Sequence, residues 1–452
     1  MTATAPPRPR AVLLGVQLAG VADGEFASSL DELARLAKTL GFQVVGRVTQ
    51  RRARLETGAV VGGGKLKELA DWTGGTGVVP VGPRIRKQRD EEDAEDSLEE
   101  KAEDRRPDAA RASLVLVDHE LTPSQARNLE RATGAEVLDR TAVILAIFQR
   151  HARSREARLQ VEIARLAYIA PRLRETGGGR DREGGGIGGR GAGESASELD
   201  RRKVRDRIAE LRAELAAIER ESGTRRVRRA QANRVALVGY TNAGKSSWMR
   251  VLTGSEVRVE DKLFATLGTT VRALQPEGAT RVLVSDTVGF IKHLPHDLVA
   301  SFRSTLDEAR ESDLLLHVVD ASDPAFESQI AVTREVLASI GADEIPRRIV
   351  LNKADRLDDA ARARVSAAHP DAWLLSAKRP EDAATLRAAL LEFFERDLEE
   401  DELVVPYALQ RVVAEAHARG YVLGETHDAE GTRLRVRASR EVLARLRAAL
   451  AG

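Results

Sequence analysis

The stretch RVALVGYTNAGKSS, residues 234–247, decides which fold the chain should adopt. Its first part, RVALVG (234–239), is a short apolar run typical of a buried strand, and the remainder has the spacing G-x-x-x-x-G-K-S. Gly239 and Gly244 allow main-chain N–H groups to turn around phosphate oxygens, and a helix reaching Leu252 would add its positive dipole end. This strand–loop–helix order predicts a phosphate-binding α/β domain.

The residue types in this loop suit a nucleoside triphosphate. Lys245 would lie against the β- and γ-phosphates, and Ser246 would supply a hydroxyl ligand for Mg²⁺. Asn242 could ligate a monovalent cation such as K⁺, although bracing of the loop is the simpler interpretation. The candidate nucleotide-binding residues of the loop are Gly239, Tyr240, Thr241, Asn242, Ala243, Gly244, Lys245, Ser246 and Ser247.

The next motif is DTVG (286–289), which follows the apolar stretch RVLVS (281–285). Asp286 would hold Mg²⁺ through its water shell, and Gly289 would offer its N–H to the γ-phosphate. A main-chain contact of this kind makes the following loop sensitive to hydrolysis. The motif therefore predicts a second switch region.

A first switch loop is expected upstream, at FATLGTTVR (264–272). Thr270 is the candidate for the hydroxyl that closes over Mg²⁺, and Thr269 is the competing choice. After Gly289, many GTPases carry a Gln that orients water, but this chain has Phe290. A phenyl ring cannot hydrogen-bond water, so we expect slow intrinsic hydrolysis that a partner or other switch residues complete.

Base recognition is predicted by IVLNKAD (349–355), a strand ending in N-K-x-D. Asp355 can accept hydrogen bonds from guanine N1–H and the 2-amino group, which adenine cannot donate. WLLSAK (373–378) would place N–H groups around Ala377 near guanine O6. The candidate base-binding residues are Asn352, Lys353, Asp355, Ser376, Ala377 and Lys378, and the whole set predicts a GTP-binding domain over 231–398.

Residues 10–141 alternate between strand-like and helix-like stretches, which predicts a mostly parallel sheet with covering helices. An insertion at 83–112 interrupts them, and its acidic part (90–104) reads as a solvated surface segment. Gly62–Lys65 is either a turn before a helix or a second nucleotide site, perhaps for ATP. The expected strands are 11–18, 42–50, 76–82 and 113–118, and the expected helices are 28–41, 62–72 and 122–134.

Residues 142–230 predict a helical hairpin, with helices over 142–173, ending near Pro171, and 198–222. The second helix carries an apolar seam at 4-3-4-3 spacing. Residues 201–230 hold eleven Lys and Arg against five Asp and Glu, which makes a polyanion partner a reasonable hypothesis. Between the helices, the Gly-rich loop 177–193 offers three candidate RNA contacts, Arg180, Arg182 and Arg190.

The remaining stretch, 402–452, suggests a small α+β domain in which His427 is a surface turn residue. The chain has no cysteine, which excludes disulfides and thiol catalysis. No apolar run approaches the ~20 residues needed to span a bilayer, so a soluble cytoplasmic protein is expected. Its net charge of +1 hides segregated acidic and basic segments.

The stretch DTVGFIKHLPHDLVASFRSTLDEA (286–309) resembles the switch II region of HflX-type GTPases, a translation-factor-related class. VGGGKLKEL (61–69), VLVDHELTPSQARNLE (115–130) and residues 137–173 are also similar to that family. The resemblance implies an N-terminal α/β domain, a helical hairpin linker and a Ras-like GTPase domain. One departure concerns the family's T-L-D-P-T, which here reads T-L-G-T-T (266–270) and leaves the register of the Mg²⁺ threonine open.

The resemblance also implies a partner and a role. It implies a monomer that associates with the large ribosomal subunit and splits or rescues stalled ribosomes under stress, in the cytoplasm or peripherally at a membrane. In that family the N-terminal domain and its helices approach the peptidyl-transferase centre, which implies that loop 177–193 contacts ribosomal RNA. The acidic stretch should then point away from RNA. The alternative is a GTP-regulated RNA-binding assembly or remodelling factor that does not split ribosomes.

Overall fold

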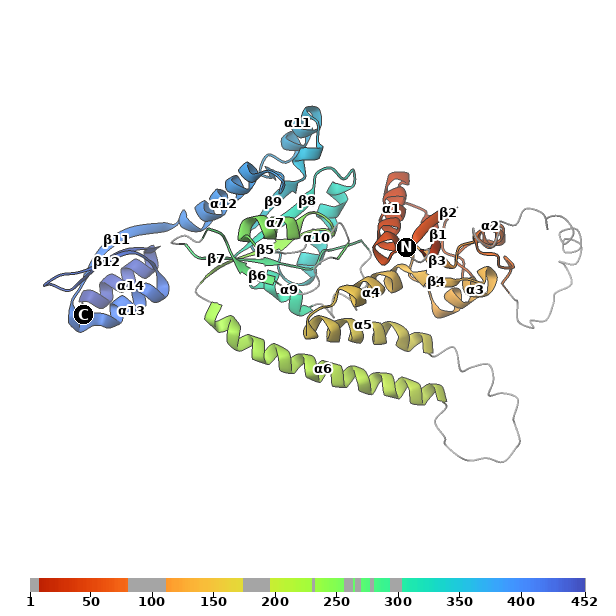
Figure 1. The fold of residues 1–452 in the computed structure, drawn as a ribbon, viewed down its shortest axis with the longest axis horizontal. Coiled ribbons are helices and arrows are strands. Elements are labelled where there is room, and N and C mark those ends of the chain that lie inside the picture. Colours follow the sequence, from red (N-terminus) through yellow and green to blue (C-terminus); the bar gives the residue numbers. More distant parts are fainter. Residues whose placement is uncertain are drawn as a thin grey trace, which may run out of the picture. The chain divides into compact units, whose positions relative to one another are not determined.

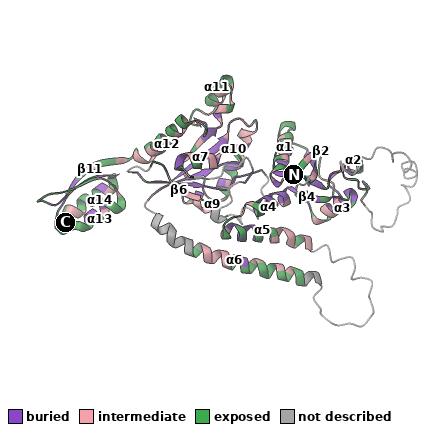
Figure 2. Ribbon diagram, viewed as in Figure 1, coloured by how far each residue is buried: buried purple, intermediate pink, exposed green. Residues whose placement is uncertain are grey.

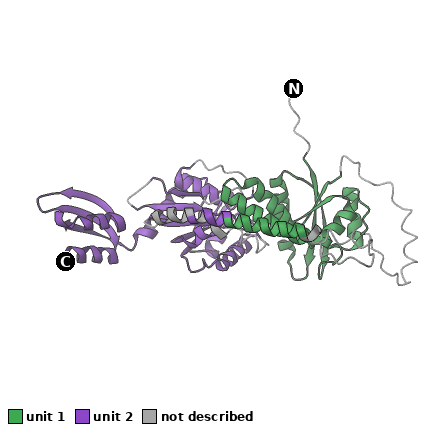
Figure 3. Cartoon of the chain, turned by 90° about the horizontal axis from the view of Figure 1, so that it is seen from below, with its two compact units in different colours: residues 1–213, 293–301 green, residues 214–292, 302–452 purple. Residues whose placement is uncertain are grey.

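The computed structural model describes residues 8–79, 111–173, 196–229, 232–255, 263–264, 270–276, 280–292 and 303–451. The chain divides into two compact units, 1–213 with 293–301 and 214–292 with 302–452 (Figure 3). In the described part of the chain, no helix combines the length and the apolar character that a membrane crossing requires.

The first unit is built on a four-stranded sheet in the order β2-β1-β3-β4, with every pair parallel (Figure 1). This confirms the mostly parallel sheet expected from the alternating pattern. The strands are β1 (Arg10–Leu18), β2 (Gln43–Arg52), β3 (Leu114–Val117) and β4 (Glu136–Asp139). The helices between them are α1 (Asp23–Leu40), α2 (Gly63–Thr73) and α3 (Pro123–Thr133).

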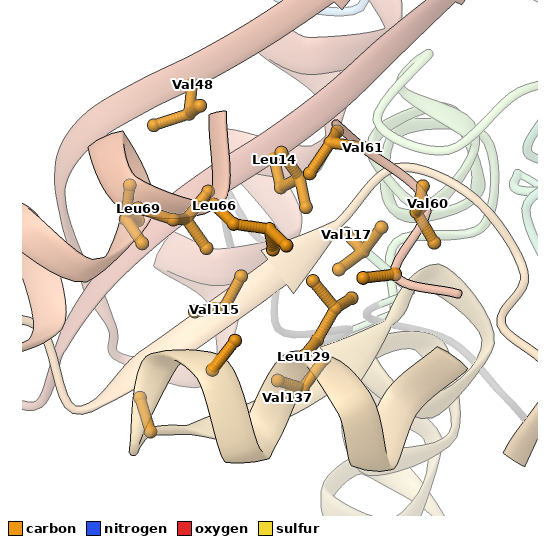
Figure 4. Packing of buried hydrophobic residues seen from close by; sticks show 14 of the residues in the cluster. Leu14, Val48, Val60, Val61, Leu66, Leu69, Val115, Val117, Leu129 and Val137 are labelled. Carbon is orange, nitrogen blue, oxygen red and sulfur yellow. The ribbon is translucent and has the colours of Figure 1, made fainter. Parts of the chain in front are cut away.

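One face of this sheet packs against α2 and α3 through an aliphatic core (Figure 4). Strands β1 and β3 have seven and four buried residues in a row, as expected for parallel strands covered on both faces. Burial of such side chains stabilises a fold by about 1.5–3 kcal/mol each. The core residues labelled in Figure 4 are Leu14, Val48, Val60, Val61, Leu66, Leu69, Val115, Val117, Leu129 and Val137.

Two expectations for this unit were wrong in detail. No strand forms over 76–79, the described part of the expected strand at 76–82, because Gly77 has φ +70 and donates its N–H to Ala132 O at the end of α3. The first helix begins at Asp23 rather than residue 28, and Asp23 and Glu25 in its first turn suit the helix dipole. Sequence reasoning also missed the short strand β4.

The helical region contains α4 (Arg140–His151), α5 (Arg155–Leu173) and α6 (Ala196–Arg229). The expected single helix over 142–173 is therefore two helices. Ala152 is extended, and the Ser154 hydroxyl accepts the Ala157 N–H at 3.0 Å, which starts α5 anew. In the seam of α6, Leu211 is buried, whereas most of this helix is half-buried or exposed (Figure 2).

The second unit holds a six-stranded sheet in the order β10-β9-β8-β5-β7-β6, parallel except for β6. The strands are β5 (Asn233–Val238), β6 (Thr270–Ala273), β7 (Val282–Asp286), β8 (Leu314–Asp320), β9 (Arg347–Asn352) and β10 (Trp373–Leu374). The helices are α7 (Lys245–Thr253), α9 (Arg303–Arg310), α10 (Phe326–Ser339), α11 (Asp359–Ala368) and α12 (Pro380–Glu395). This is the expected P-loop GTPase sheet.

A three-stranded antiparallel sheet, in the order β11-β13-β12, follows α12. Its elements are β11 (Leu398–Val405), α13 (Gln410–Arg419), β12 (Tyr421–His427), β13 (Thr432–Ser439) and α14 (Arg440–Ala451). Both helices contribute to one apolar core with the sheet, which confirms the small α+β region. His427 ends β12, and its Nδ1 lies 3.1 Å from the Thr432 hydroxyl across the hairpin.

Candidate functional site

Two positions of the loop after β5 can be occupied only by glycine. Gly239 has φ +142, and a Cβ there would lie 2.1 Å from Val318 O on β8. Gly244 has φ +102, and a Cβ there would lie 2.1 Å from Asn352 Nδ2. Both conformations are ones that L side chains rarely adopt. The two glycines predicted for phosphate binding are therefore also required by the close approach of β8 and β9.

Lys245, the first residue of α7, is buried beneath the loop that it follows. Its Nζ donates to Gly239 O at 3.0 Å and to Tyr240 O at 2.9 Å. Burial lowers the pKa of Lys245 to about 8, and the nearby Asp286 carboxylate opposes this shift. A phosphate would supply a charged acceptor for this ammonium group, which here has main-chain carbonyls as its hydrogen-bond partners.

The three candidate Mg²⁺ residues come from α7, β7 and β6. The Ser246 hydroxyl donates to Asp286 Oδ2 at 2.8 Å, so two of the proposed ligands are in contact. Thr270 lies directly opposite Asp286 in the antiparallel pairing of β6 with β7. Hydroxyl and carboxylate oxygens are hard ligands of the kind that Mg²⁺ prefers. The residues at this corner therefore fit the cation that the loop motif implies.

The residues that follow DTVG lie along the phosphate loop. Thr241 donates its N–H to Phe290 O at 2.8 Å, and Phe290 donates its N–H to Gly239 O at 3.1 Å. A Cβ on Gly289 would lie 2.9 Å from Thr241 Cα and 3.0 Å from Lys245 Nζ, so this position also requires glycine. Phe290 itself is only 2% exposed.

The base-recognition loops are joined to the phosphate loop by Asn352, at the end of β9. Its Nδ2 donates to Ala243 O at 2.7 Å, and its Oδ1 accepts the Ala377 N–H at 3.1 Å. Lys353 reaches the same loop, because its Nζ donates to Asn242 O at 2.8 Å. The structure thus brings the phosphate loop together with base-recognition motifs that lie more than a hundred residues further along the sequence.

Asp355 lies in a short 3-10 turn, Ala354–Arg356. Its Oδ1 accepts the Ser376 hydroxyl at 2.6 Å, and its Oδ2 is 3.5 Å from Lys378 Nζ. The hydrogen bond from Ser376 and the charge of Lys378 lower the pKa of Asp355 against the effect of burial. The carboxylate is therefore ionised at neutral pH, as an acceptor for two guanine donors must be.

Sequence reasoning missed two carboxylates that support these loops. Asp320, at the end of β8, pairs with Lys353 Nζ at 2.6 Å. Asp382, in the first turn of α12, accepts the Ser376 N–H at 2.7 Å. The position of Asp320 at the carboxyl end of a strand beside β5 was the available signal. Asp382 does not follow a strand, so its position in the sequence gave no comparable indication.

Several expectations lie outside the described residues. These are the competing threonine, Thr269, the acidic stretch 90–104 and the three loop arginines, Arg180, Arg182 and Arg190. The alternative site at Gly62–Lys65 is described. There, Gly62 donates its N–H to Gln50 Oε1 at 3.0 Å, and Lys65 pairs with Glu68 at 2.5 Å, an arrangement that suits a turn opening a helix.

Three family models match the chain in sequence. Residues 27–81 and 95–149 match the "GTP-binding GTPase N-terminal" model, and residues 151–229 match the "GTP-binding GTPase Middle Region" model. Residues 234–353 match the model described as "50S ribosome-binding GTPase". The three matches follow one another along most of the chain.

Curated relatives extend this likeness to the full length. The GTPase HflX of Gluconacetobacter diazotrophicus is 59% identical, with 99% of both chains covered, and that of Caldanaerobacter subterraneus subsp. tengcongensis is 39% identical, with 97% and 93% covered. Among solved structures, the crystal structure of the SsGBP and GDP complex has a TM-score of 0.45 and 22% identity, covering 85% of this chain and 98% of that one. On the evidence of its full-length relatives, the chain belongs to the HflX family of GTPases.

Proposed function

We propose that this GTPase uses GTP to act on ribosomes through the large subunit, and that it splits or rescues stalled ribosomes. The observation that carries the proposal is full-length similarity to HflX GTPases together with the match of 234–353 to a 50S ribosome-binding GTPase model. The arrangement of the loops after β5, β7 and β9 supports GTP as the ligand. The site residues are those named from the sequence motifs.

In the proposed bound state, main-chain N–H groups of 239–247 surround the phosphates and Lys245 adds its charge. Asp355 selects guanine by accepting two hydrogen bonds. Ser246, Thr270 and Asp286 would hold Mg²⁺, which would offset the negative charge that develops during phosphoryl transfer. The contact between Ser246 and Asp286 supports this assignment.

Hydrolysis is proposed to be slow without a partner, because Phe290 cannot orient water. We expect Phe290→Ala to keep most intrinsic activity, whereas Lys245→Ala should lose it. Since Phe290 is buried, thermal unfolding of Phe290→Ala must be measured alongside turnover. If the folded Phe290→Ala protein loses as much hydrolysis as Lys245→Ala, the phenyl ring has a catalytic role. That result would contradict the proposal that Phe290 takes no part in hydrolysis.

Asn242 is the proposed ligand for K⁺ beside the phosphates. It has φ +61, and its carbonyl accepts a hydrogen bond from Lys353. The proposal predicts faster hydrolysis in K⁺ than in Na⁺ at equal ionic strength. Equal rates in the two salts would favour the simpler role of bracing the loop.

Contact with ribosomal RNA is proposed for Arg180, Arg182 and Arg190. Replacing all three with Gln should weaken binding to the large subunit and reduce its salt dependence, because fewer counterions are released when fewer phosphates are neutralised. Deleting 90–104 should leave binding intact if the acidic stretch points away from RNA. Loss of binding in the deletion variant would contradict that placement.

The deciding experiment uses the full chain with purified ribosomes and separated subunits. Co-sedimentation in GTP, a non-hydrolysable analogue and GDP should show enrichment on the large subunit with the triphosphates. Light scattering should then show subunit dissociation in the triphosphate states. Binding without dissociation would instead support an assembly or remodelling factor, and failure to bind the large subunit would overturn the proposal.

A further inference from the structure

Tyr240 makes contacts that phosphate binding does not require. It occupies a variable position of the G-x-x-x-x-G-K-S loop, where only the main chain needs to face a phosphate. Its side chain is 4% exposed, and its hydroxyl oxygen accepts the main-chain N–H of Lys292 at 2.7 Å. An aromatic ring at this position therefore reaches from the phosphate loop to the segment that follows DTVG.

The same residue holds the phosphate-binding lysine. The main-chain carbonyl of Tyr240 accepts Lys245 Nζ at 2.9 Å, while its hydroxyl accepts the Lys292 N–H. Phe290 also hydrogen-bonds to the phosphate loop: its N–H donates to Gly239 O, and its carbonyl accepts the Thr241 N–H. Three hydrogen bonds therefore fix residues 290–292 along the loop.

This attachment has a direct effect on Gly289. The glycine directly precedes the attached segment, and its Cα lies so close to the loop that a Cβ would be 3.0 Å from Lys245 Nζ. The Gly289 N–H belongs to the peptide unit just before the attached residues, so fixing these residues restrains its position. Movement of residues 290–292 away from the loop would therefore also turn Gly289 away from the phosphate-binding lysine.

We propose that Tyr240 is a positioning residue for GTP hydrolysis: by accepting the Lys292 N–H, it keeps residues 290–292 on the phosphate loop and so aims Gly289 at the γ-phosphate. The hydroxyl contributes selectivity for the triphosphate, because GDP has no γ-phosphate for Gly289 to contact. Its effect should therefore separate GTP from GDP rather than weaken both. Intrinsic GTP hydrolysis needs no ribosome, so the test of this proposal does not depend on whether the protein splits ribosomes.

Tyr240→Phe tests the proposal, because it keeps the buried ring and removes only the hydroxyl that accepts the Lys292 N–H. Loss of a buried hydrogen bond is costly, so part of the population should release the segment. We expect the affinity for a non-hydrolysable GTP analogue and kcat to fall about fivefold to tenfold. The affinity for GDP should change less than about twofold, because GDP lacks the γ-phosphate contact. Isothermal titration and single-turnover hydrolysis by the full chain, without ribosomes, measure these quantities.

Tyr407→Phe is the control, because it removes an exposed tyrosine hydroxyl that donates to Asp428 O far along the chain from the loop. It should leave both affinities and kcat unchanged. If Tyr240→Phe lowered the affinities for the GTP analogue and for GDP equally, the hydroxyl would have only a structural role. If neither affinity changed, the contact would contribute nothing to nucleotide binding. Both results overturn the proposal.

Hydrogen exchange gives a second test, and its first measurement uses the unmodified protein, so that part does not depend on a variant folding. The Lys292 amide should exchange slowly with GDP and with the GTP analogue bound, as a buried hydrogen-bonded amide does. In Tyr240→Phe its exchange should be at least about tenfold faster than in the unmodified protein. Exchange of this amide at the rate of an exposed loop in the unmodified protein would overturn the proposal.

Discussion

Charged side chains at the carboxyl ends of the parallel strands are balanced in different ways in the N-terminal sheet and in the GTPase sheet. At the N-terminal sheet, Arg140 pairs with Asp118 at 2.6 Å and with Glu32 at 2.9 Å, and all three side chains are at most 5% exposed. At the GTPase sheet, the buried Lys245 instead donates to main-chain carbonyls of its own loop. The first charge is balanced by the protein, and the second can be balanced by a ligand.

A second cluster follows β4 at the N-terminal sheet. Asp139 accepts the Tyr168 hydroxyl and Arg172 Nη2, each at 2.8 Å, and caps α4 through the Ala142 N–H. Arg172 also stacks on the Tyr168 ring, 3.4 Å from its centroid. Polar groups at the carboxyl ends of parallel strands often mark a ligand site. Here they join α5 to the sheet, so position in the fold alone does not identify a binding site.

Removing the internally balanced charge should give the largest effect. Arg140→Met leaves Asp118 and Glu32 buried without their partner, which should cost about 3–5 kcal/mol of unfolding free energy. Hydrogen exchange in β1 and β3 and thermal unfolding measure the loss. Arg47→Met is the control, because the Arg47–Asp31 pair is roughly half exposed and contributes at most about 1 kcal/mol. Equal losses in the two variants would contradict the comparison.

Removing the ligand-facing charge should act on chemistry instead of folding. Lys245→Ala should reduce GTP turnover by roughly 10²–10³-fold, since it removes a charge aimed at the transferring phosphate. Thermal unfolding of the nucleotide-free protein should change little. Lys65→Ala provides the control from the other glycine-rich turn, where Lys65 pairs with Glu68. A comparable loss of GTP turnover in Lys65→Ala would mean that both turns serve the nucleotide.

The two charges should also differ in their response to pH. Burial lowers the pKa of Lys245 to about 8, and the proposed contact with phosphate requires the charged form of this lysine. Above pH 8 the site must take up a proton to bind, so nucleotide affinity should be level below pH 7 and then fall by up to about tenfold per pH unit. Titrations between pH 6.5 and 9.5 measure this. Lys245→Arg should bind with a flatter profile, because its guanidinium does not titrate in this range; an equally steep fall would assign the proton elsewhere.

The smallest effect on stability is expected when Asp139 loses one of its several hydrogen-bond donors. Tyr168→Phe removes one hydrogen bond to Asp139, which keeps Arg172 and two main-chain donors, Ala142 and Leu121. The unfolding free energy should fall by about 1 kcal/mol, with GTP turnover unchanged. Denaturant titration measures the first quantity. A loss as large as that of Arg140→Met would show that Tyr168 is central to the buried network.

The predictions from sequence were most specific where the chemistry is local. The glycines, Lys245 and Ser246 lie within eight positions, and the strand and helix that flank them follow from apolar pattern. The residues that sequence reasoning missed are defined by contacts that the motifs do not specify. Asp320 pairs with Lys353, 33 residues further along the chain, and Asp382 accepts a hydrogen bond from the main chain of Ser376. The break before α5 was missed for another reason: residues 149–158 contain neither glycine nor proline, and only the Ser154 cap marks the start of the next helix.

The position of Asn352 has a consequence for the thermodynamics of binding. The buried Asn352 side chain hydrogen-bonds to Ala243 of the phosphate loop and to Ala377 of the base loop in the absence of a nucleotide. These loops therefore have little conformational entropy left to lose when the base and phosphates enter together. Association should therefore depend mainly on the encounter of the nucleotide with a site that is already formed.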